Sequence, residues 1–286
     1  MLCRQRSELL KDLTRYTNHL TALLDQIFPG YEHVFSKVSN KGSLAVLTAY
    51  PTPRDILQAN QSHLAEVIST ASHKGITFGL QKVEKLRTVA CNACALGVSS
   101  SGDAGIITSS VAMLTALQEN LVSLEDEIKH LVASDVNVQE NVVLLQTIPG
   151  IGYWIAAVIT SEIGDFSDFS YPKQLAAYFG LDPSQRQSGT FHGTKNRMSK
   201  RGSPHVRAML HMAAHNSICS VRGKPPHNPV LAEYYAKKCL AKPGKAAVGA
   251  VMHKLCNIIF AVLRDRKPFE LRQPSDHAAR LGMKAA

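Results

Sequence analysis

Aromatic and charged residues are scarce in this sequence. Aromatic side chains make up 6% of the 286 residues and charged side chains 19%, whereas 45% of the residues are hydrophobic. So large a hydrophobic fraction excludes a disordered chain, and the core must consist mainly of Ala, Leu, Val and Ile. That mixture suits packed helices better than a β-sandwich. We therefore expect a mainly α protein that is long enough for two domains.

Long hydrophobic runs and a disulfide framework are also missing. No apolar run approaches the roughly 18 residues of a membrane-spanning helix, and the N-terminal segment lacks the apolar stretch of a signal peptide. The six cysteines lie in helix-like sequence without extracellular spacing. We expect a soluble, cytoplasmic protein with reduced thiols and no membrane partner. Cys91 and Cys94 form a CxxC without a second pair, so we interpret them as small core residues.

Positive charge, by contrast, is abundant and regional. The formal net charge is +10, and residues 180–268 hold sixteen Lys or Arg against three acids, a local charge of +13. Residues 101–170 hold ten acids and one base. A strongly basic region points to a polyanionic partner. We therefore expect a nucleic-acid-binding face in the C-terminal half.

Two segments carry apolar residues at the helical spacing of three and four. One covers residues 4–28 and ends at Pro29-Gly30, and the other covers residues 112–131 with coiled-coil spacing over fewer than three heptads. The second is either one helix of an antiparallel intramolecular bundle or a zipper between two copies. Thr52 before Pro53 predicts a capped helix start, and polar stretches at 99–102 and 134–140 are the best linkers.

The sharpest motif covers residues 144–164, LLQTIPGIGYWIAAVITSEIG. An apolar helix end, then PGIG, then a second apolar helix is the pattern of a helix-hairpin-helix. Gly150 and Gly152 permit a tight turn that presents backbone N–H groups at a helix N-terminus, where phosphate binds without regard to base sequence. The alternative is an ordinary helical hairpin with no ligand.

A polar, glycine-rich segment follows at residues 180–202, between a helix expected at 172–179 and another that begins at about Pro204. Ser188-Gly189 stands at its middle. A serine hydroxyl can attack a phosphodiester where cations counter the phosphate charge. The cations of this segment are Arg186, Lys195, Arg197, Lys200 and Arg201. The alternative is that the serines only hydrogen-bond phosphate.

The order of these motifs resembles one family, the transposases of insertion sequence 110 and its relatives 116 and 902, which include the pilin-gene invertases. The matching motifs are Phe28-Pro29-Gly30-Tyr31-Glu32, Tyr50-Pro51-Thr52-Pro53, Ile148-Pro149-Gly150-Ile151-Gly152, Glu162-Ile163-Gly164-Asp165-Phe166, Leu175-Ala176-Ala177-Tyr178-Phe179-Gly180-Leu181, Pro183, Ser188-Gly189, Ser199-Lys200-Arg201-Gly202, the helix around Arg207 and the closing helix Val248 to Leu263. They cover most of the chain and are densest from 144 to 268.

The resemblance implies a site-specific DNA recombinase with three parts. These are an RNase H-like domain that binds Mg²⁺ through four acids, a coiled coil that allows a homo-oligomer, and a C-terminal transposase domain with a nucleophilic serine. DNA is the implied substrate and a structured guide RNA an implied partner. The catalytic serine corresponds to Ser188. The DNA-binding residues that we assign are Gly150, Gly152, Arg186, Gly189, Lys195, Arg197, Ser199, Lys200, Arg201 and Arg207.

The chain departs from the family pattern within the serine segment and at its start. Gln187 and Thr190 stand where family members often have a second serine and glycine, and the spacing from there to Ser199 is about one residue longer. The opening segment resembles the helix after the family's last acidic motif, and no strand-rich acidic segment precedes it. We therefore predict an N-terminally truncated transposase without a metal-binding residue or cofactor of its own.

The predicted organisation is a helical and coiled-coil region at 1–140, a transposase domain at 143–268 and a loose tail at 269–286. Two clusters are candidate replacements for the missing metal ligands. For Glu162, Asp165 and Asp168 we favour helix capping, and for His211, His215 and Cys219 we favour polar packing or phosphate contact. The lysines of residues 237–245 form either a solvated face or a nucleic-acid contact.

Three functions are compatible with this pattern. The first is a DNA transposase or recombinase that acts through Ser188. The second is a catalytically inactive nucleic-acid-binding remnant of such an enzyme. The third is a repair enzyme that uses the helix-hairpin-helix. It is the weakest hypothesis, because no catalytic Asp or Lys is recognisable at a helix end beyond Gly164.

Overall fold

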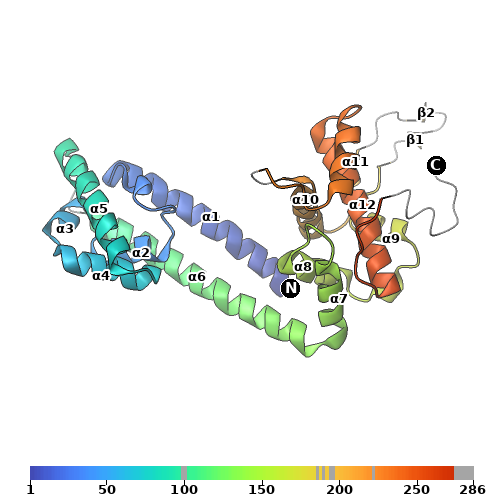
Figure 1. Ribbon diagram of the computed structural model, residues 1–286, viewed down its shortest axis with the longest axis horizontal. Helices are drawn as coiled ribbons and strands as arrows, with labels where there is room; N and C mark the ends of the chain where they lie inside the picture. Colours follow the sequence, from blue (N-terminus) through green and yellow to red (C-terminus); the bar gives the residue numbers. More distant parts are fainter. Residues whose placement is uncertain (98–101, 185–186, 189–190, 193–196, 221–222, 274–286) are drawn as a thin grey trace. The chain divides into compact units, whose positions relative to one another are not determined.

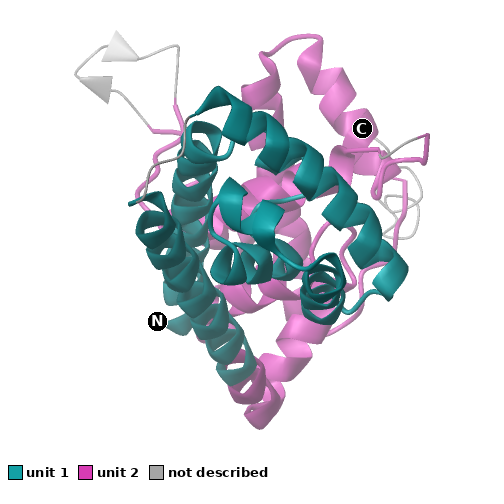
Figure 2. Cartoon of the chain, turned by 90° about the vertical axis from the view of Figure 1, so that its left-hand side faces the viewer, with its two compact units in different colours: residues 1–127 teal, residues 128–286 magenta. Residues whose placement is uncertain are grey.

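The computed structural model is mainly α, which confirms the expected fold class (Figure 1). It describes residues 1–97, 102–184, 187–188, 191–192, 197–220 and 223–273. The chain divides into two compact units, Met1–Glu127 and Ile128–Ala286, which Figure 2 colours separately. The division falls inside one long helix, α6 (Asp103–Ser134).

Unit 1 is built on two long antiparallel helices, α1 (Leu2–Ile27) and α6 (Figure 1). The guanidinium of Arg6, near the start of α1, pairs with the carboxylate of Glu125, near the end of α6, at 2.7 Å. The elements between these helices in sequence are η1 (Tyr31–His33), α2 (Lys41–Ala49), α3 (Pro53–Gln58), α4 (Gln61–Ser72) and α5 (Ile76–Leu96).

The core of unit 1 gathers side chains from all of its helices and from the η1 turn with its flanking residues. Leu24 of α1 and Leu114 of α6 are fully buried in one cluster with Leu47, Leu64 and Leu86. The 112–131 stripe therefore begins inside a core of its own chain, as the intramolecular alternative expects. The zipper between two copies stays a prediction.

Local sequence signals in unit 1 give one confirmation and one correction. Thr52 caps α3 as predicted, because its backbone N–H donates to the Asp55 carboxylate at 2.9 Å and its hydroxyl accepts the Asp55 N–H at 3.3 Å. The interpretation of the CxxC as core residues is wrong for Cys91, which is exposed, while Cys94 is half-buried. The core face of α5 runs instead through Ala90 and its helical neighbours.

Helix α12 (Gly244–Asp265) is central to unit 2. It packs against α7 (Val136–Gln146), α9 (Pro172–Tyr178), α10 (Pro204–Ile218) and α11 (Pro229–Cys239), while α8 (Tyr153–Ile163) packs against α7 and α10. By length and composition alone α12 could cross a membrane, contrary to the expectation that no segment has this character. Its apolar face, which includes Leu255, Ile259 and Phe260, is buried in the core cluster of unit 2, as in a core helix.

The stretch 134–140, predicted to be a linker, is mostly helical. Helix α6 ends at Ser134, the Asp135 carboxylate accepts the Val138 N–H at 3.1 Å, and α7 begins at the next residue. The prediction was wrong because an aspartate that caps a new helix resembles a polar loop in sequence. The other predicted linker, 99–102, lies outside the described residues apart from Gly102.

The predicted loose tail begins at a residue that contacts the core. Phe269 packs against the core cluster of unit 2, and its backbone N–H donates to the Thr147 hydroxyl at 2.8 Å. Residues 274–286 of this tail lie outside the described residues.

Candidate nucleic-acid interface

Helices α7 and α8 form a helical hairpin, and Gly150 in its turn packs against α10. Gly150 has a φ of +100°, which favours glycine. A Cβ at this position would lie 2.8 Å from the Ala213 carbonyl oxygen and 2.8 Å from the Ser217 backbone nitrogen. The Ser217 hydroxyl also donates to the Pro149 carbonyl at 2.7 Å. Gly150 therefore allows the turn to touch α10.

Gly152 has a different environment in the same turn. It is exposed, it is the N-cap of α8 with a φ of −89°, and a Cβ there would meet nothing within 4 Å. The N-terminus of α8 carries the positive end of the helix dipole. Of the two predicted phosphate-binding glycines, one thus lies in a helix contact and the other at an open helix end. Phosphate binding by this hairpin stays a prediction.

Ser188 belongs to a small β-hairpin (Figure 1). Strand β1 (Gln187–Ser188) pairs antiparallel with β2 (Phe191–His192), and Ser188 lies opposite Phe191. The predicted site residues Arg186, Gly189 and Lys195 lie outside the described residues, as do the side chains of 185–196. The structure therefore places the Ser188 backbone on a paired strand.

Two segments connect this hairpin to α9 and α10. We call residues 180–184 the first arm and residues 197–202 the second arm. Backbone hydrogen bonds join the arms from Ser184 N–H to Arg197 O at 2.6 Å, from Ser199 N–H to Asp182 O at 2.8 Å and from Lys200 N–H to Gly180 O at 3.1 Å. An isolated bridge between Pro183 and Met198 continues the pairing. The two arms form a paired base for the hairpin.

Three of the predicted DNA-binding cations, Arg197, Lys200 and Arg201, are exposed on the second arm. They follow one another closely along a segment whose backbone is fixed by pairing. Closely spaced exposed cations attract phosphate oxygens and release counterions when they bind. The arrangement suits contact with a phosphate backbone.

Two further described residues that we assigned to DNA, Ser199 of the second arm and Arg207 of α10, make contacts inside the protein. The Ser199 hydroxyl donates to the Asp182 carboxylate at 2.5 Å. Arg207 Nη1 donates to the carbonyl oxygens of Phe179 at 3.2 Å and Gly202 at 2.5 Å. The sequence analysis did not identify Asp182 as the partner of Ser199. The two residues are seventeen positions apart, and only the pairing of the arms brings them together.

The acidic trio Glu162, Asp165 and Asp168 has a capping role at its centre, as predicted. Asp165 is the N-cap of η2 (Phe166–Asp168), and its carboxylate accepts the Ser167 backbone N–H at 2.9 Å. Hydrogen bonds from the Ser167 backbone and hydroxyl lower the pKa of Asp165.

The residues His211, His215 and Cys219 form an exposed ridge on α10. His215 Nδ1 lies 3.4 Å from Cys219 Sγ, and the His211 and His215 ring centroids lie 5.5 Å apart. Across the part of the chain that the structure describes, no three His, Cys, Asp or Glu side chains are placed to hold a metal ion. The ridge makes polar contacts within itself.

The lysine-rich stretch 237–245 joins α11 to α12 beside a groove. Lys238 and Lys254 place their ammonium groups 5.3 and 5.5 Å from the centre of the Tyr234 ring, and Lys237 pairs with Glu233 at 2.6 Å. The groove, of about 810 Å³, lies between α11, α12 and the segment after α12. Both alternatives for these lysines, a solvated face and a nucleic-acid contact, stay open.

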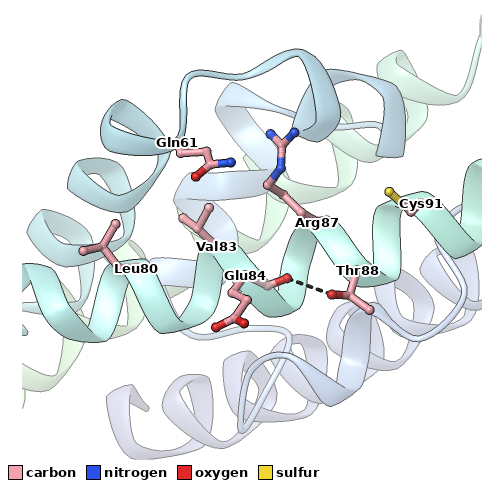
Figure 3. A pocket seen from close by; sticks show the side chains of 7 residues that line it. All are labelled: Gln61, Leu80, Val83, Glu84, Arg87, Thr88 and Cys91. Carbon is pink, nitrogen blue, oxygen red and sulfur yellow. Dashed lines mark hydrogen bonds between the residues drawn. The ribbon is translucent and has the colours of Figure 1, made fainter.

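Unit 1 has a shallow pocket of about 370 Å³ along α5 (Figure 3). Two of its polar side chains form hydrogen bonds with backbone carbonyl groups of the protein. The Arg87 guanidinium donates to the Leu57 carbonyl at 3.2 Å and so ties α5 to the end of α3. The Thr88 hydroxyl donates to the Glu84 carbonyl of its own helix at 3.0 Å.

Comparison with known proteins gives a consistent result for unit 2. Residues 142–236 match the model of the Transposase IS116/IS110/IS902 family. The chain is 25% identical to the insertion element IS116 uncharacterized 44.8 kDa protein of Streptomyces clavuligerus, over 98% of this chain and 66% of that protein. It is 25% identical to the IS110 uncharacterized 43.6 kDa protein of Streptomyces coelicolor, over 94% of this chain and 63% of that protein.

A third relative is the pilin gene-inverting protein of Moraxella bovis, which is 30% identical over 54% of this chain and 46% of that protein. The chain thus spans less than two thirds of the length of each of these relatives. The matched family region runs from α7 into α11, and it contains the hairpin, both arms and α10.

Proposed function

We propose that the chain is a DNA transposase or site-specific recombinase in which Ser188 attacks a DNA phosphodiester. The premise is the match of residues 142–236 to the model of the IS116/IS110/IS902 transposase family. The observation that carries the proposal is the paired base under the Ser188 hairpin. The arms on either side of the strand that bears Ser188 are paired, and Arg197, Lys200 and Arg201 are exposed on the second arm.

The proposed step exchanges one phosphoester bond for another. The Ser188 hydroxyl oxygen loses its proton and forms a bond to phosphorus, the bond from phosphorus to a deoxyribose oxygen breaks, and that departing oxygen takes up a proton to become a hydroxyl. Negative charge builds on the phosphoryl oxygens in the transition state, so nearby cations lower its energy. Arg197, Lys200 and Arg201 supply this countercharge in the proposal.

The Mg²⁺ implied by the family resemblance does not fit the residues described. No group of three or more potential ligands is gathered anywhere in that part of the chain. We therefore derive no step of the reaction through a metal ion.

The proposal also covers the partners. Duplex DNA is the proposed substrate, and the proposed location is the cytoplasm. A structured guide RNA is a further proposed partner, and so is a second copy of the chain that binds through residues 112–131. The +13 charge of residues 180–268 supports a polyanionic partner.

A salt series with a covalent readout tests the proposal. The purified chain is mixed with labelled duplex DNA and with RNA in the presence of Mg²⁺, and the product strands are analysed for attached protein. We expect steeply salt-dependent binding and a covalent adduct that Ser188→Ala abolishes. Ser184→Ala is the matched control in the first arm, and it should keep the adduct. An adduct that survives Ser188→Ala would refute the assignment of the nucleophile.

A second candidate function is that of a nucleic-acid-binding remnant without catalysis. The exposed cations of the second arm support nucleic-acid binding, which requires no catalytic step. This alternative predicts the same steep salt dependence with no adduct for any variant. The same experiment therefore separates the two functions.

A further inference from the structure

The Ser188 hairpin connects to the helices of unit 2 through its two arms. The first arm follows α9 and the second arm precedes α10 (Figure 1). The arms are therefore the described segments on either side of the strands that include Ser188. A displacement of about 1 Å at a reacting group can cost on the order of a hundredfold in rate.

We infer that Arg207 is a positioning residue, which clamps the base of the two arms and so holds the Ser188 hairpin in place for attack on DNA. This inference rests on the proposed function. It reassigns Arg207, which the sequence pattern suggested as a DNA contact, to a role inside the protein.

The contacts of Arg207 carry the inference. A single nitrogen, Nη1, donates to the Phe179 carbonyl at 3.2 Å and to the Gly202 carbonyl at 2.5 Å. Phe179 is the residue just before the first arm and the C-cap of α9, and Gly202 is the last residue of the second arm. Hydrogen bonds from a charged donor are roughly twice as strong as neutral ones. The guanidinium thus joins the entrance of one arm to the exit of the other.

The arms touch through their backbones at this point. A Cβ at Gly180 would lie 2.6 Å from the Gly202 backbone nitrogen, and a Cβ at Gly202 would lie 2.6 Å from the Phe179 carbonyl carbon. Gly180 has a φ of +67° and Lys200 a φ of +58°. Because no side chain separates the two backbones, their spacing depends on hydrogen bonds that cross between the arms.

A second tie lies farther along the arms. The Ser199 hydroxyl donates to the Asp182 carboxylate at 2.5 Å, and the Ser199 N–H donates to the Asp182 carbonyl at 2.8 Å. This side-chain tie acts on the same pair of segments as Arg207. A positioning role for Arg207 therefore predicts that loss of the Ser199 hydroxyl gives a weaker form of the same defect.

The test separates positioning from phosphate contact. Arg207→Met, Ser199→Ala and the unchanged full chain are compared for DNA affinity across a salt series and for the rate of adduct formation at saturating DNA. We expect Arg207→Met to lower the adduct rate on the order of a hundredfold and Ser199→Ala to lower it less. DNA affinity and its salt slope should stay the same in both variants. Arg264→Met, an exposed arginine of α12 outside the arms, is the control for a lost charge and should change neither.

A loss of about one in the salt slope for Arg207→Met, with an adduct rate restored at saturating DNA, would mark Arg207 as a phosphate contact and overturn the inference. Hydrogen exchange at the Ser184, Ser199 and Lys200 amides gives a readout that does not need catalysis. Exchange about five- to tenfold faster in Arg207→Met is expected from the lost hydrogen bonds, and unchanged exchange would overturn the clamp. If the unchanged chain forms no adduct, the proposed function fails, while the exchange rates still decide on the clamp.

Discussion

Gly150 and Gly152 lie two positions apart in one turn, and their surroundings give them different roles. Gly150 combines a positive φ with close contact to the backbone of α10, whereas Gly152 has a negative φ and open space around it. The first glycine is therefore a requirement of the fold. The second is not required by packing, and it is the N-cap of α8.

Gly150→Ala should lower the free energy of unfolding by at least about 2 kcal/mol, because the added Cβ meets α10 and the backbone is strained. Gly152→Ala should change it by less than about 1 kcal/mol. Urea unfolding followed by circular dichroism measures both values. Equal losses for the two variants would contradict the contact between Gly150 and α10 as the cause.

For single residues, the sequence predicts whether a side chain is exposed better than it predicts the hydrogen-bond partner of that side chain. Arg197, Lys200 and Arg201 are exposed, as their place in a polar segment suggested. Arg207 and Ser199 belong to the same basic pattern, but they bond to Phe179, Gly202 and Asp182. Hydrogen-bond partners of this kind depend on distances between segments that the sequence does not give.

Among the helices, α6 shows how one leucine spacing serves different environments along its length. Leu114 is fully buried in the core of unit 1, and Leu131 of the same stripe is 49% exposed. At 3.6 residues per turn the two leucines lie about 100° apart around the helix, because a spacing of three and four drifts around a straight α-helix. Near Leu131 the covered residues of α6 are Ile128, which is buried, and Val132, which packs against the core of unit 2.

Leu114→Ala should lower the free energy of unfolding by about 2–5 kcal/mol, since it leaves a cavity in a packed core. Leu131→Ala should change it by about 0.5 kcal/mol or less. Thermal unfolding of both variants is measured at several protein concentrations. An intramolecular bundle predicts a midpoint that does not depend on concentration, and a rise of the midpoint with concentration would support the zipper instead.

Helix starts are the best-determined features of the elements. Thr52 at α3 and Pro204 at α10 stand where the sequence places a cap or a first turn. The start of α7 was missed because Asp135 and the polar residues after it resemble a linker. An aspartate in a polar stretch caps a helix only if the apolar residues that follow are buried in a core. That burial depends on the tertiary structure.

For the whole molecule, the uneven charge distribution has a direct consequence for binding. The excess of cations lies in residues 180–268, and three of them are exposed together on the second arm. A phosphate backbone that contacts this arm releases counterions for each cation it meets. The salt dependence of binding therefore reports on the arm.

The double substitution Arg197→Gln with Lys200→Gln should reduce the slope of log affinity against log salt for duplex DNA by about 2. The matched control is Lys11→Gln with Arg15→Gln on α1, where both cations pair with acids of the same helix. The control should leave the slope unchanged. Fluorescence anisotropy at several salt concentrations measures both slopes, and an equal loss in the control would show that net charge, and not the second arm, governs binding.

The sequence by itself determined the mainly α class, the starts of α3 and α10, the basic C-terminal half and the motif order that resembles the transposase family. These features are local or compositional, because they depend on spacing, capping and charge along the chain. The tertiary structure alone decided that α12 is a core helix, that Gly150 touches α10 and that Arg207 joins the two arms. Each of these depends on how closely segments distant in sequence approach, which packing fixes and local pattern does not.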